Sequence, residues 1–569
     1  MERRLLLVFA ITFLIILISQ PLLKKYEPKP QEPAAPVQRP RAAPVNPLSP
    51  AQVAEQPARV LPPAGVKQAS AEAESVVEND LYRIRFSNRG GQVKSWVLKK
   101  YEDDNGNPLE LVHTAAAEKY GYPLSLWSYD ESLRNKLNSA LYVGPDGNSL
   151  SAPTAITFEY SDSDVSVRKS FRFDHSYLVT MEISVVANGA AVPALPMWPA
   201  GFGDESNPAA YATSQVEYQN DGKIDRLSVK KVIGGATVQG PFQWAGVTDR
   251  YFAAVFLPED PTASALVTLN NPLDVPRTPQ KPESKEMIKV EVLGAAVGNF
   301  KGATVQRMYV GPKDLKTLEA IPVPTIAGSE PPDLRGLVDF GWLGLIARPL
   351  FLWLKWTYKY VGNWGWAIVI QTLIINLALL PLRLSQMKSM LKMQRVAPQI
   401  KSIQEKYKKY SLRDPRKQEM NQEIAALYKQ HGVNPAGGCL PLLIQMPFLF
   451  AYYRMLGVAL DLRHAHWLWI RDLSGPDPWH ILPIAIIITM LFMQRMTPQP
   501  GMDPVQQKMM NFMMPAFLGF ISLNLAAGLC LYWSEGNLIG IVQQAIMNRT
   551  ELGREMREMM EKRARKKDK

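Results

Sequence analysis

Cysteine is nearly absent from this chain of 569 residues. Its two cysteines, Cys439 and Cys530, both lie in apolar segments. The sequence therefore offers no disulfide framework to an exported domain and no spacing that fits a zinc site. The length nevertheless allows more than one domain and a large buried core.

Catalytic signatures are missing as well. The sequence has no Walker loop, no nucleophile elbow and no cluster of metal ligands, and the lack of a nucleotide-binding motif argues against a primary pump. His464 and His466 in "HAHW" share one face of a strand or loop, but without a third ligand a structural role is favoured over a metal site. His113 and His175 are far apart and have no evident partner. We therefore expect no catalytic residue, no metal and no cofactor.

Acidic residues are outnumbered, with 52 Asp and Glu against 64 Lys and Arg, which gives a net charge of +12. Such a balance suits nucleic acid, the ribosome or anionic lipid equally well, so the position of the charge must decide. The mean hydropathy of −0.11 is that of a soluble protein. An average of this kind can hide a mixture of apolar spans and polar domains.

The N-terminus carries an apolar run. Arg3 and Arg4 precede "LLLVFAITFLIILIS" (5–19), which fits either an uncleaved anchor or a cleaved signal peptide. No small-x-small cleavage site follows closely, so an anchor over residues 1–22 is favoured. Residues 23–70 form a linker, because proline recurs every few residues from 27 to 65 and aromatic residues are absent there.

Residues 71–335 change to a period of two. Runs such as "DLYRIRFSN" and "DVSVRKSFRF" alternate apolar and polar residues and are separated by Gly, Asn, Asp and Pro. Short alternating runs broken by turn residues predict an antiparallel β-sandwich.

Residues 336–548 are predicted to be a helical membrane core. Aromatic residues and lysines interleave in "RPLFLWLKWTYKYVG", which predicts an interfacial helix over 347–361. With the anchor, the apolar blocks of this region give six spans, five of them in the core: 365–384, 438–460, 479–496, 509–525 and 526–546.

The distribution of Lys and Arg predicts the topology. Residues 383–432 carry twelve basic and four acidic residues, whereas 461–478 carry two basic and three acidic ones. The amphipathic helical hairpin predicted over 384–432 is therefore cytoplasmic, as is the basic tail over 549–569. Both termini lie inside and the β-sandwich lies outside.

Polar side chains interrupt the predicted spans. Thr372 and Asn376 share a helix face, and Arg383 continues the stripe at its cytoplasmic end. One such residue would be explained by a hydrogen bond between helices, but so many favour a wetted cavity. The polar residues are Gln371, Thr372, Asn376, Gln445, Arg454, Asn524, Tyr532, Glu535 and Gln543.

Two charges in the spans are expected to meet. Arg454 and Glu535 both fall in the middle-to-outer part of the bilayer, and an uncompensated charge there costs about 2.5–3.5 kcal/mol on insertion scales. We predict an ion pair between them. The alternative is that Arg454 reaches the outer interface and Glu535 is protonated.

The hairpin carries a stripe of methionines, Met387, Met390 and Met393, at a spacing of three. Methionine accepts many apolar partners, so the stripe suits either a transient partner or the seal between the two helices. The sequence leaves these alternatives equal. The positive charge of the hairpin and the tail also suits a polyanion such as ribosomal RNA.

Several segments resemble one family. "VGNWGWAI", "MLKMQRVAPQIKSIQEKY", "HGVNPAGGCLPLLIQMPFLFAYY" and "DPVQQKMMNFMMP" are similar to the bacterial inner-membrane insertases of the Oxa/Alb/YidC family, and "FSNRGGQVKSWVLKKY" resembles their periplasmic domain. The resemblance implies a five-span core that inserts nascent membrane proteins and helps them fold, alone or beside the Sec translocon. It also implies contact with lipid, the ribosome and targeting machinery, and no covalent chemistry.

The resemblance further implies a polar groove open to cytoplasm and lipid. Carried over to this chain, the groove residues are Gln371, Thr372, Asn376, Arg383, Gln445, Met446, Tyr532, Trp533 and Glu535. Family members commonly have arginine at the position of Asn376. This chain therefore lacks the usual fixed groove charge, and we expect hydration and Arg383 to replace it.

Two other functions remain open from the residues alone. A small-solute transporter is compatible with the polar spans, although no internal repeat or paired broken helices are evident. A carbohydrate-binding receptor is compatible with the β-sandwich. Deletion of most of 72–320 separates these possibilities, because an insertase core should keep its activity and a receptor should lose it.

Overall fold

The structure is a computed structural model that describes residues 65–558, apart from 146–148, 206, 278–285, 326–332, 411–413, 434–439, 497–508, 552–553 and 556–557. The predicted anchor, almost all of the predicted linker and most of the basic tail lie outside the described residues. The side chains of 386–387, 390–391, 394 and 440–445 are not described either.

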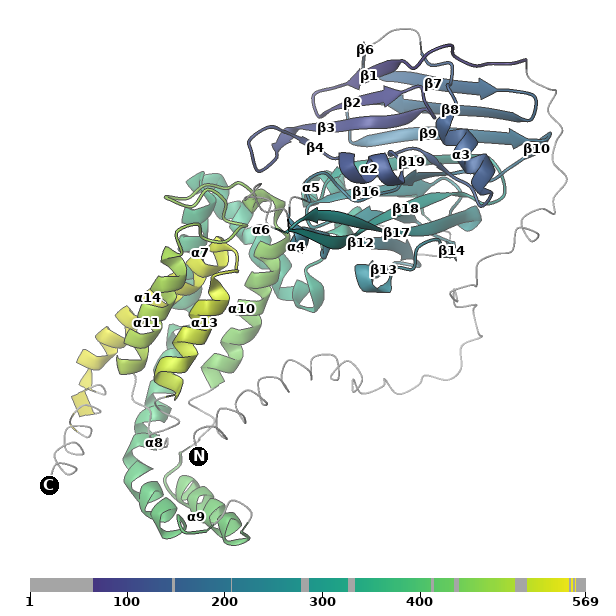
Figure 1. The fold of residues 1–569 in the computed structure, drawn as a ribbon. Helices are drawn as coiled ribbons and strands as arrows, with labels where there is room; N and C mark the ends of the chain where they lie inside the picture. The colour runs from purple at the N-terminus through teal and green to yellow at the C-terminus, as the bar shows by residue number, and fades with distance from the viewer. Residues whose placement is uncertain are drawn as a thin grey trace. The chain divides into compact units, whose positions relative to one another are not determined.

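The first part of the chain is built from three β-sheets (Figure 1). The first sheet has the order β4-β3-β2-β1-β6, and its strands are β1 (Glu74–Glu78), β2 (Tyr82–Ser87), β3 (Gln92–Glu102), β4 (Pro108–Glu110) and β6 (Ser149–Ser151). Its pairs are antiparallel except for β1 with β6, which is parallel.

The second sheet has the order β13-β12-β15-β16-β19-β9-β8-β7, and the short β10 (Ala190–Ala191) pairs with β9. Its strands are β7 (Thr154–Ser161), β8 (Val165–Phe173), β9 (Leu178–Ala187), β12 (Gln215–Asn220), β13 (Lys223–Ser228), β15 (Trp244–Thr248), β16 (Phe252–Pro258) and β19 (Thr304–Pro312). Neighbouring strands along it are antiparallel.

The third sheet has the order β14-β17-β18-β11-β5. Its strands are β5 (Leu126–Trp127), β11 (Leu195–Trp198), β14 (Thr237–Gln239), β17 (Ser264–Pro276) and β18 (Met287–Asn299). Short helices connect the sheets: α2 (Thr114–Tyr120), α3 (Glu131–Ser139), α4 (Pro208–Tyr211) and α5 (Leu315–Glu319). A β-rich domain over the predicted region is therefore confirmed.

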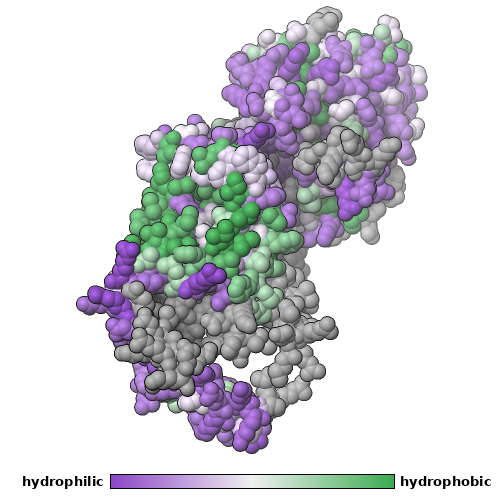
Figure 2. Space-filling view, turned by 60° about the vertical axis from the view of Figure 1, so that its left-hand side comes forward, coloured by the Kyte–Doolittle hydropathy of each residue, from purple (hydrophilic) through white to green (hydrophobic). Residues whose placement is uncertain are grey.

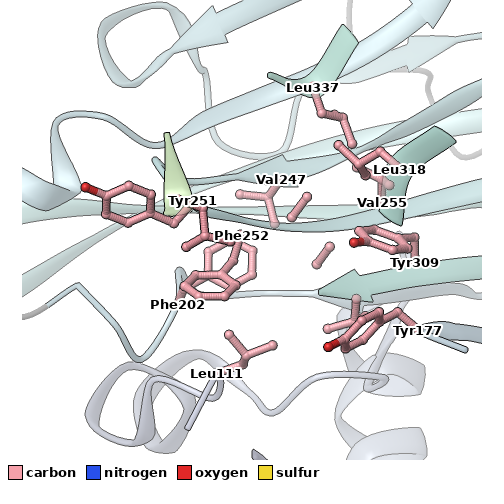
Figure 3. Close-up of a cluster of buried hydrophobic side chains, with 14 of the residues drawn as sticks. Leu111, Tyr177, Phe202, Val247, Tyr251, Phe252, Val255, Tyr309, Leu318 and Leu337 are labelled. Atoms are coloured by element: carbon pink, nitrogen blue, oxygen red, sulfur yellow. The ribbon is translucent and has the colours of Figure 1, made fainter. Parts of the chain in front are cut away.

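The period of two in the sequence explains the core of this β-domain. Along β8, the odd-numbered positions are buried and the even-numbered ones are half-buried or exposed, as expected for a strand with one face on the core. Aromatic side chains fill much of the interior, among them Phe202, Phe252 and Tyr309 (Figure 3).

The second part of the chain is helical. Its helices are α6 (Gly344–Val361), α7 (Trp364–Ala378), α8 (Leu380–Lys406), α9 (Arg416–Gln430), α10 (Leu440–Val458), α11 (Ile481–Met496), α13 (Met514–Ser522) and α14 (Ala527–Arg549), with a π-helical turn at Met509–Met513. A helix is thus found in each predicted span of the core and in the predicted interfacial segment.

The junction of α6 and α7 follows from two residues. Gly362 adopts a positive φ of 69° and ends α6, and the side chain of Asn363 accepts a hydrogen bond from the backbone N–H of Trp366 at the start of α7. The two helices meet at 120°. By length and composition, no single described helix could cross a membrane, whereas the bent pair Gly341–Val361 and Trp364–Ala378 could.

The helices α8 and α9 pack against each other as the predicted hairpin requires. Val396 and Ile400 of α8 share a buried cluster with Ile424 and Leu427 of α9. Met393 packs against the same cluster, which favours the sealing role for this methionine. The side chains of Met387 and Met390 lie outside the described residues.

The surface differs between the two parts (Figure 2). In this view, hydrophobic side chains gather over the helical region, and the visible face of the β-domain is mostly hydrophilic. The exposed apolar side chains of the helical region include Ile370, Leu373 and Leu377 on α7 and Ile484 and Ile488 on α11.

Candidate functional site

The polar side chains of α7 face the interior of the helix bundle. Gln371 and Thr372 are fully buried, and Asn376 is 4% exposed. The opposite face of α7 carries the exposed apolar residues Ile370 and Leu373. A buried polar group is costly unless it has a hydrogen-bonding partner, so the partners of these groups define the site.

Gln371 joins three helices. Its Nε2 donates to the backbone oxygen of Leu350 on α6 at 3.0 Å, and its Oε1 accepts a hydrogen bond from the hydroxyl of Tyr452 on α10. Tyr452 in turn stacks on Tyr532 of α14, with ring centroids 4.2 Å apart and planes 15° apart. The amide and the two rings hold α6, α7, α10 and α14 together.

Asn376 and Arg383 lie at the centre of a second set of contacts. Arg383 Nη2 lies 3.1 Å from Asn376 Oδ1, and Arg383 Nη1 lies 2.6 Å from Gln543 Oε1 on α14. Gln543 Nε2 donates to the backbone oxygen of Asn376 at 3.3 Å. Asn376 Nδ2 donates to the backbone oxygen of Thr372 at 2.9 Å, and the Thr372 hydroxyl donates to Ile368.

These contacts form a closed polar ring, which we call the amide ring and define by Asn376, Arg383 and Gln543. Arg383, which the sequence places on the same stripe as Asn376, contacts it over seven residues of chain. A small residue on α14 makes room for the guanidinium: a Cβ on Gly540 would lie 2.9 Å from Arg383 Nη1 and 2.5 Å from Met493 Cε.

The predicted ion pair between Arg454 and Glu535 is wrong. Arg454 Nη2 lies 2.9 Å from Asp339 Oδ2 and 3.0 Å from the backbone oxygen of Asp339. Asp339 stands in the turn before α6, outside the apolar blocks, so a count of charges within spans could not find it. Glu535 is half-buried, and its Oε2 has no hydrogen-bonding partner in the described part of the chain.

The remaining predicted groove residues differ in how far they are exposed. Met446 on α10 is 36% exposed, and Phe450 and Tyr453 are exposed on the same helix. Trp533 is half-buried and packs against the core. The side chain of Gln445 lies outside the described residues.

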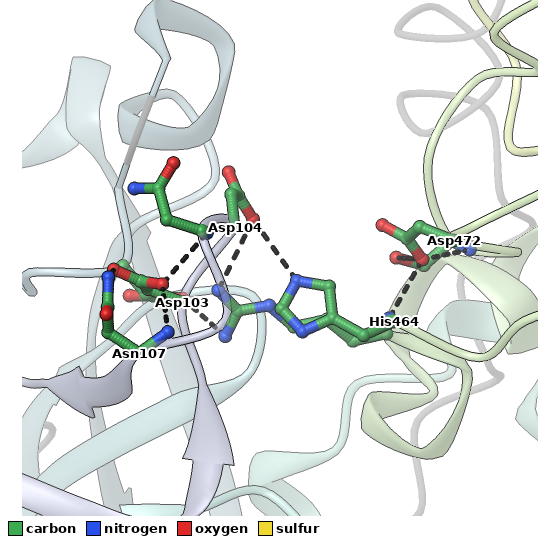
Figure 4. Close-up of polar contacts among 9 residues, drawn as sticks. Asp103, Asp104, Asn107, His464 and Asp472 are labelled. Atoms are coloured by element: carbon green, nitrogen blue, oxygen red, sulfur yellow. Dashed lines mark hydrogen bonds and ion pairs between the residues drawn. The ribbon is translucent and has the colours of Figure 1, made fainter.

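The connection between α10 and α11 meets the β-domain. His464 Nε2 lies 3.3 Å from Oδ1 of Asp104 in the turn between β3 and β4, and the backbone N–H of His464 donates to Asp472 at 3.1 Å (Figure 4). Arg463 Nη1 lies 3.6 Å from Asp204 Oδ2. The backbone oxygen of His466 accepts a hydrogen bond from the side chain of Asn363. The described residues contain no group of three His, Cys, Asp or Glu side chains that could hold a metal.

Two acidic side chains beside this contact are unusual. The side chain of Asp204 is 7% exposed and Glu205 is buried, and both lie close to Asp249. Burial, reinforced by the charge of Asp249, raises the pKa of Asp204 well above its ordinary value and raises the pKa of Glu205 to about 8. Sequence reasoning missed these residues, because acidic side chains in a turn look solvated until the fold buries them.

A buried lysine was also missed. Lys169 on β8 is fully buried, and its Nζ donates to the backbone oxygens of Gly90 at 2.7 Å, Leu124 at 2.8 Å and Gly91 at 3.3 Å. Burial lowers its pKa to about 7. A signal existed in the sequence, since Lys169 shares the inward register of Val165, Val167, Phe171 and Phe173.

Among the described residues, the helical site combines hydrogen-bonding groups with exposed apolar side chains. Comparison with known proteins assigns the chain. A family model described as YidC periplasmic domain matches residues 74–353, and one described as 60Kd inner membrane protein matches residues 356–554. The membrane protein insertase YidC of Syntrophus aciditrophicus is 32% identical over 588 residues, covering 96% of this chain and 100% of that protein. The chain belongs to the YidC family of membrane protein insertases.

A second relative agrees with this assignment. The membrane protein insertase YidC of Geobacter metallireducens is 33% identical over 523 residues, covering 88% of this chain and 90% of the relative. A crystal structure of active YidC insertase with its first transmembrane domain resolved covers 85% of this chain and 94% of that chain, at 18% identity and a TM-score of 0.34.

Membership settles the broad function. The chain is an inner-membrane protein insertase with a periplasmic β-rich domain, and its substrates are nascent membrane proteins. The relatives are named as insertases and not as enzymes.

Proposed function

We propose that the translocated segment of a client passes along the amide ring of α7, α8 and α14. The observation that carries this proposal is the ring itself, in which a half-buried guanidinium meets two buried amides inside the helix bundle. Each amide presents both donors and an acceptor, so its hydrogen bonds can be exchanged for bonds to a passing peptide. A polar segment that enters the bilayer would then lose water without losing every hydrogen-bonding partner.

The apolar part of the client leaves sideways into lipid. Met446, Phe450 and Tyr453 on α10 and Phe517 and Phe520 on α13 are exposed and support this exit. Transfer of an apolar span from water to lipid is favourable and drives the step. The groove of Gln371, Thr372, Gln445, Tyr532, Trp533 and Glu535 is part of this proposal.

The proposed topology has six spans, with the anchor at 1–22 and five in the core region 336–548. The linker at 23–70 and the β-domain at 71–335 are periplasmic, and the hairpin at 384–432 and the tail at 549–569 are cytoplasmic. The excess of Lys and Arg in the hairpin and tail supports this orientation. The same charge supports contact with the ribosome or targeting machinery, and the Sec translocon remains a proposed partner.

Arg383 takes the place of the family's groove arginine in this proposal. Its guanidinium already donates hydrogen bonds to Asn376 and Gln543, so these N–H groups are less available to an acidic client. Selectivity for acidic translocated segments should therefore be weaker than is usual for the family.

The test compares Asn376→Leu with Asn376→Arg in an insertion assay. Leucine removes the acceptor of Arg383 and should impair neutral and acidic clients alike, and arginine should favour the acidic clients. Asn537→Leu is the matched control, because Asn537 Nδ2 donates to Thr489 Oγ1 at 3.1 Å and joins α14 to α11 away from the ring. If Asn376→Leu inserts every client as well as the parent does, the ring is not the client path.

A further inference from the structure

The helix α14 has two distinct faces. One face meets the amide ring and the stacked tyrosines through Tyr532, Gly536, Gly540 and Gln543, where a Cβ on Gly536 would lie 3.9 Å from Asn376 Nδ2. The other face is apolar and exposed, with Leu538, Val542 and Ile546 at 53%, 57% and 61% exposure.

Glu535 extends the exposed face. It precedes Leu538 by three residues and Val542 by seven, and residues at these spacings lie on one side of a helix. A carboxyl group therefore continues the row of Leu538, Val542 and Ile546, one turn from Leu538 and beside Tyr532. It stands at the edge between the ring face and the open face of α14.

The basic side chains Arg383 and Arg454 of the helical region have partners other than Glu535. Arg383 donates hydrogen bonds to Asn376 and Gln543, and Arg454 forms an ion pair with Asp339. In the part of the chain that the structure describes, Glu535 takes part in no ion pair, and its Oε2 is shielded from solvent without a partner. Thr372 is a side-chain hydrogen-bonding partner of the carboxyl group, but a buried carboxyl oxygen without a partner is costly in apolar surroundings, and a donor brought by a client would remove this cost.

We propose that Glu535 recognises the client, so that this insertase favours translocated segments that carry a positive charge, from Lys, Arg or a free N-terminal ammonium group. This inference rests on the client path proposed above. The guanidinium of Arg383 keeps its charge, but it already donates to Asn376 and Gln543, whereas Oε2 of Glu535 has no hydrogen-bonding partner among the described residues. The charge preference of the path is then opposite to that of a groove with a free arginine.

The experiment uses the full chain in proteoliposomes without a membrane potential, so that the field across the bilayer does not act on the charges of the client. Three versions of one single-span client carry three Lys, three Ser or three Asp in the translocated segment. The insertase is tested as the parent, as Glu535→Gln and as Glu551→Gln. The last variant removes an exposed carboxylate from the residue that follows the Arg549–Thr550 end of α14 and is the matched control.

The parent should insert the Lys client better than the Asp client. Glu535→Gln should lower the ratio of Lys to Ser insertion by about three- to five-fold, the effect expected of a partly exposed ion pair. Glu551→Gln should leave all ratios unchanged.

An unchanged ratio of Lys to Ser insertion in Glu535→Gln overturns the inference, as does an equal loss for all three clients, which would indicate a packing role. Failure of the client path itself looks different. In that case Asn376→Leu would insert the Ser client normally, whatever the result at Glu535.

Discussion

The β-domain and the helical region bury polar groups in different ways. In the β-domain, the ammonium group of Lys169 is held by three backbone oxygens of the turns at Gly90, Gly91 and Leu124. In the helical region, the guanidinium of Arg383 is held by the side chains of Asn376 and Gln543. Lys169 is fully buried and Arg383 is half-buried, and neither has a carboxylate partner within its cluster.

The difference lies in the partners. A backbone oxygen in a turn is fixed by the fold and cannot leave Lys169 without unfolding the turn. A side-chain amide has two rotatable bonds or more, and it offers a donor and an acceptor at once. The contacts of Lys169 therefore stabilise one structure of the β-domain. The hydrogen bonds of Arg383 to side-chain amides can instead be exchanged for hydrogen bonds to a client.

The largest effect is expected from cutting the amide ring. Arg383→Leu should lower insertion of every client by more than ten-fold, because Asn376 Oδ1 and Gln543 Oε1 lose their donor inside an apolar bundle, at a cost of about 1–3 kcal/mol for each unpaired group. Insertion into proteoliposomes measures this. Arg549→Leu at the exposed end of α14 is the control and should insert normally.

The matching change in the β-domain should affect stability more than insertion. Lys169→Met removes the donor of three buried backbone oxygens and should destabilise the β-domain by about 2–4 kcal/mol. Thermal unfolding followed by tryptophan fluorescence should shift to lower temperature. Insertion at a temperature where the variant is still folded should remain near that of the parent, and a large loss there would contradict the division of roles between the two regions.

The same lysine predicts a pH dependence. Its pKa in the folded protein is about 7, below its ordinary value near 10.5, so between these values the unfolded chain binds more protons than the folded one. The contribution of Lys169 to stability should rise with pH across this window, by at most about 1.4 kcal/mol per pH unit.

The difference in unfolding free energy between the parent and Lys169→Met isolates this contribution. The difference should grow in favour of the parent from pH 7 to pH 10. Glu205 acts in the opposite sense, because its raised pKa of about 8 makes stability fall as pH rises from about 4.5 to 8. A pH-independent difference between parent and Lys169→Met would show that burial does not lower the pKa of Lys169.

The smallest effect is expected at Arg454. Its pair with Asp339 is partly exposed on both sides, and such pairs contribute about 0.2–1 kcal/mol. Asp339→Asn and Arg454→Gln should each lower the melting temperature slightly. The loss of stability in the double variant should not exceed the sum of the two single losses. Substitution of Glu535 should not change the shift in melting temperature that Arg454→Gln causes. If it does, the ion pair between Arg454 and Glu535 expected from the sequence would be supported.

Much of the architecture follows from sequence patterns. The period of two along β8, the apolar blocks of the core and the break at Gly362 and Asn363 each predict an element that the structure contains. The contact of Asn376 with Arg383 also follows from helical spacing, because residues seven apart lie on one face.

What could not be predicted depends on partners far apart in the sequence. Gln543 and Tyr452 complete the polar site from other helices, 167 and 81 residues from their α7 partners. Arg454 finds Asp339, 115 residues away, in a turn that carries no span signal. Asp204 becomes buried only because the turn that carries it packs against Asp249 and Arg463.

The central claim is that a client passes beside Asn376, which is buried when no client is bound. The most direct measurement is disulfide formation between a stalled client with one cysteine and an insertase with one cysteine, in a background with Cys439→Ser and Cys530→Ser that must retain insertion. Asn376→Cys and Met446→Cys should cross-link to the client at chain lengths that place its translocated segment in the membrane, and Ile488→Cys on the exposed face of α11 should not. Cross-linking from Ile488→Cys with none from Asn376→Cys would contradict the account.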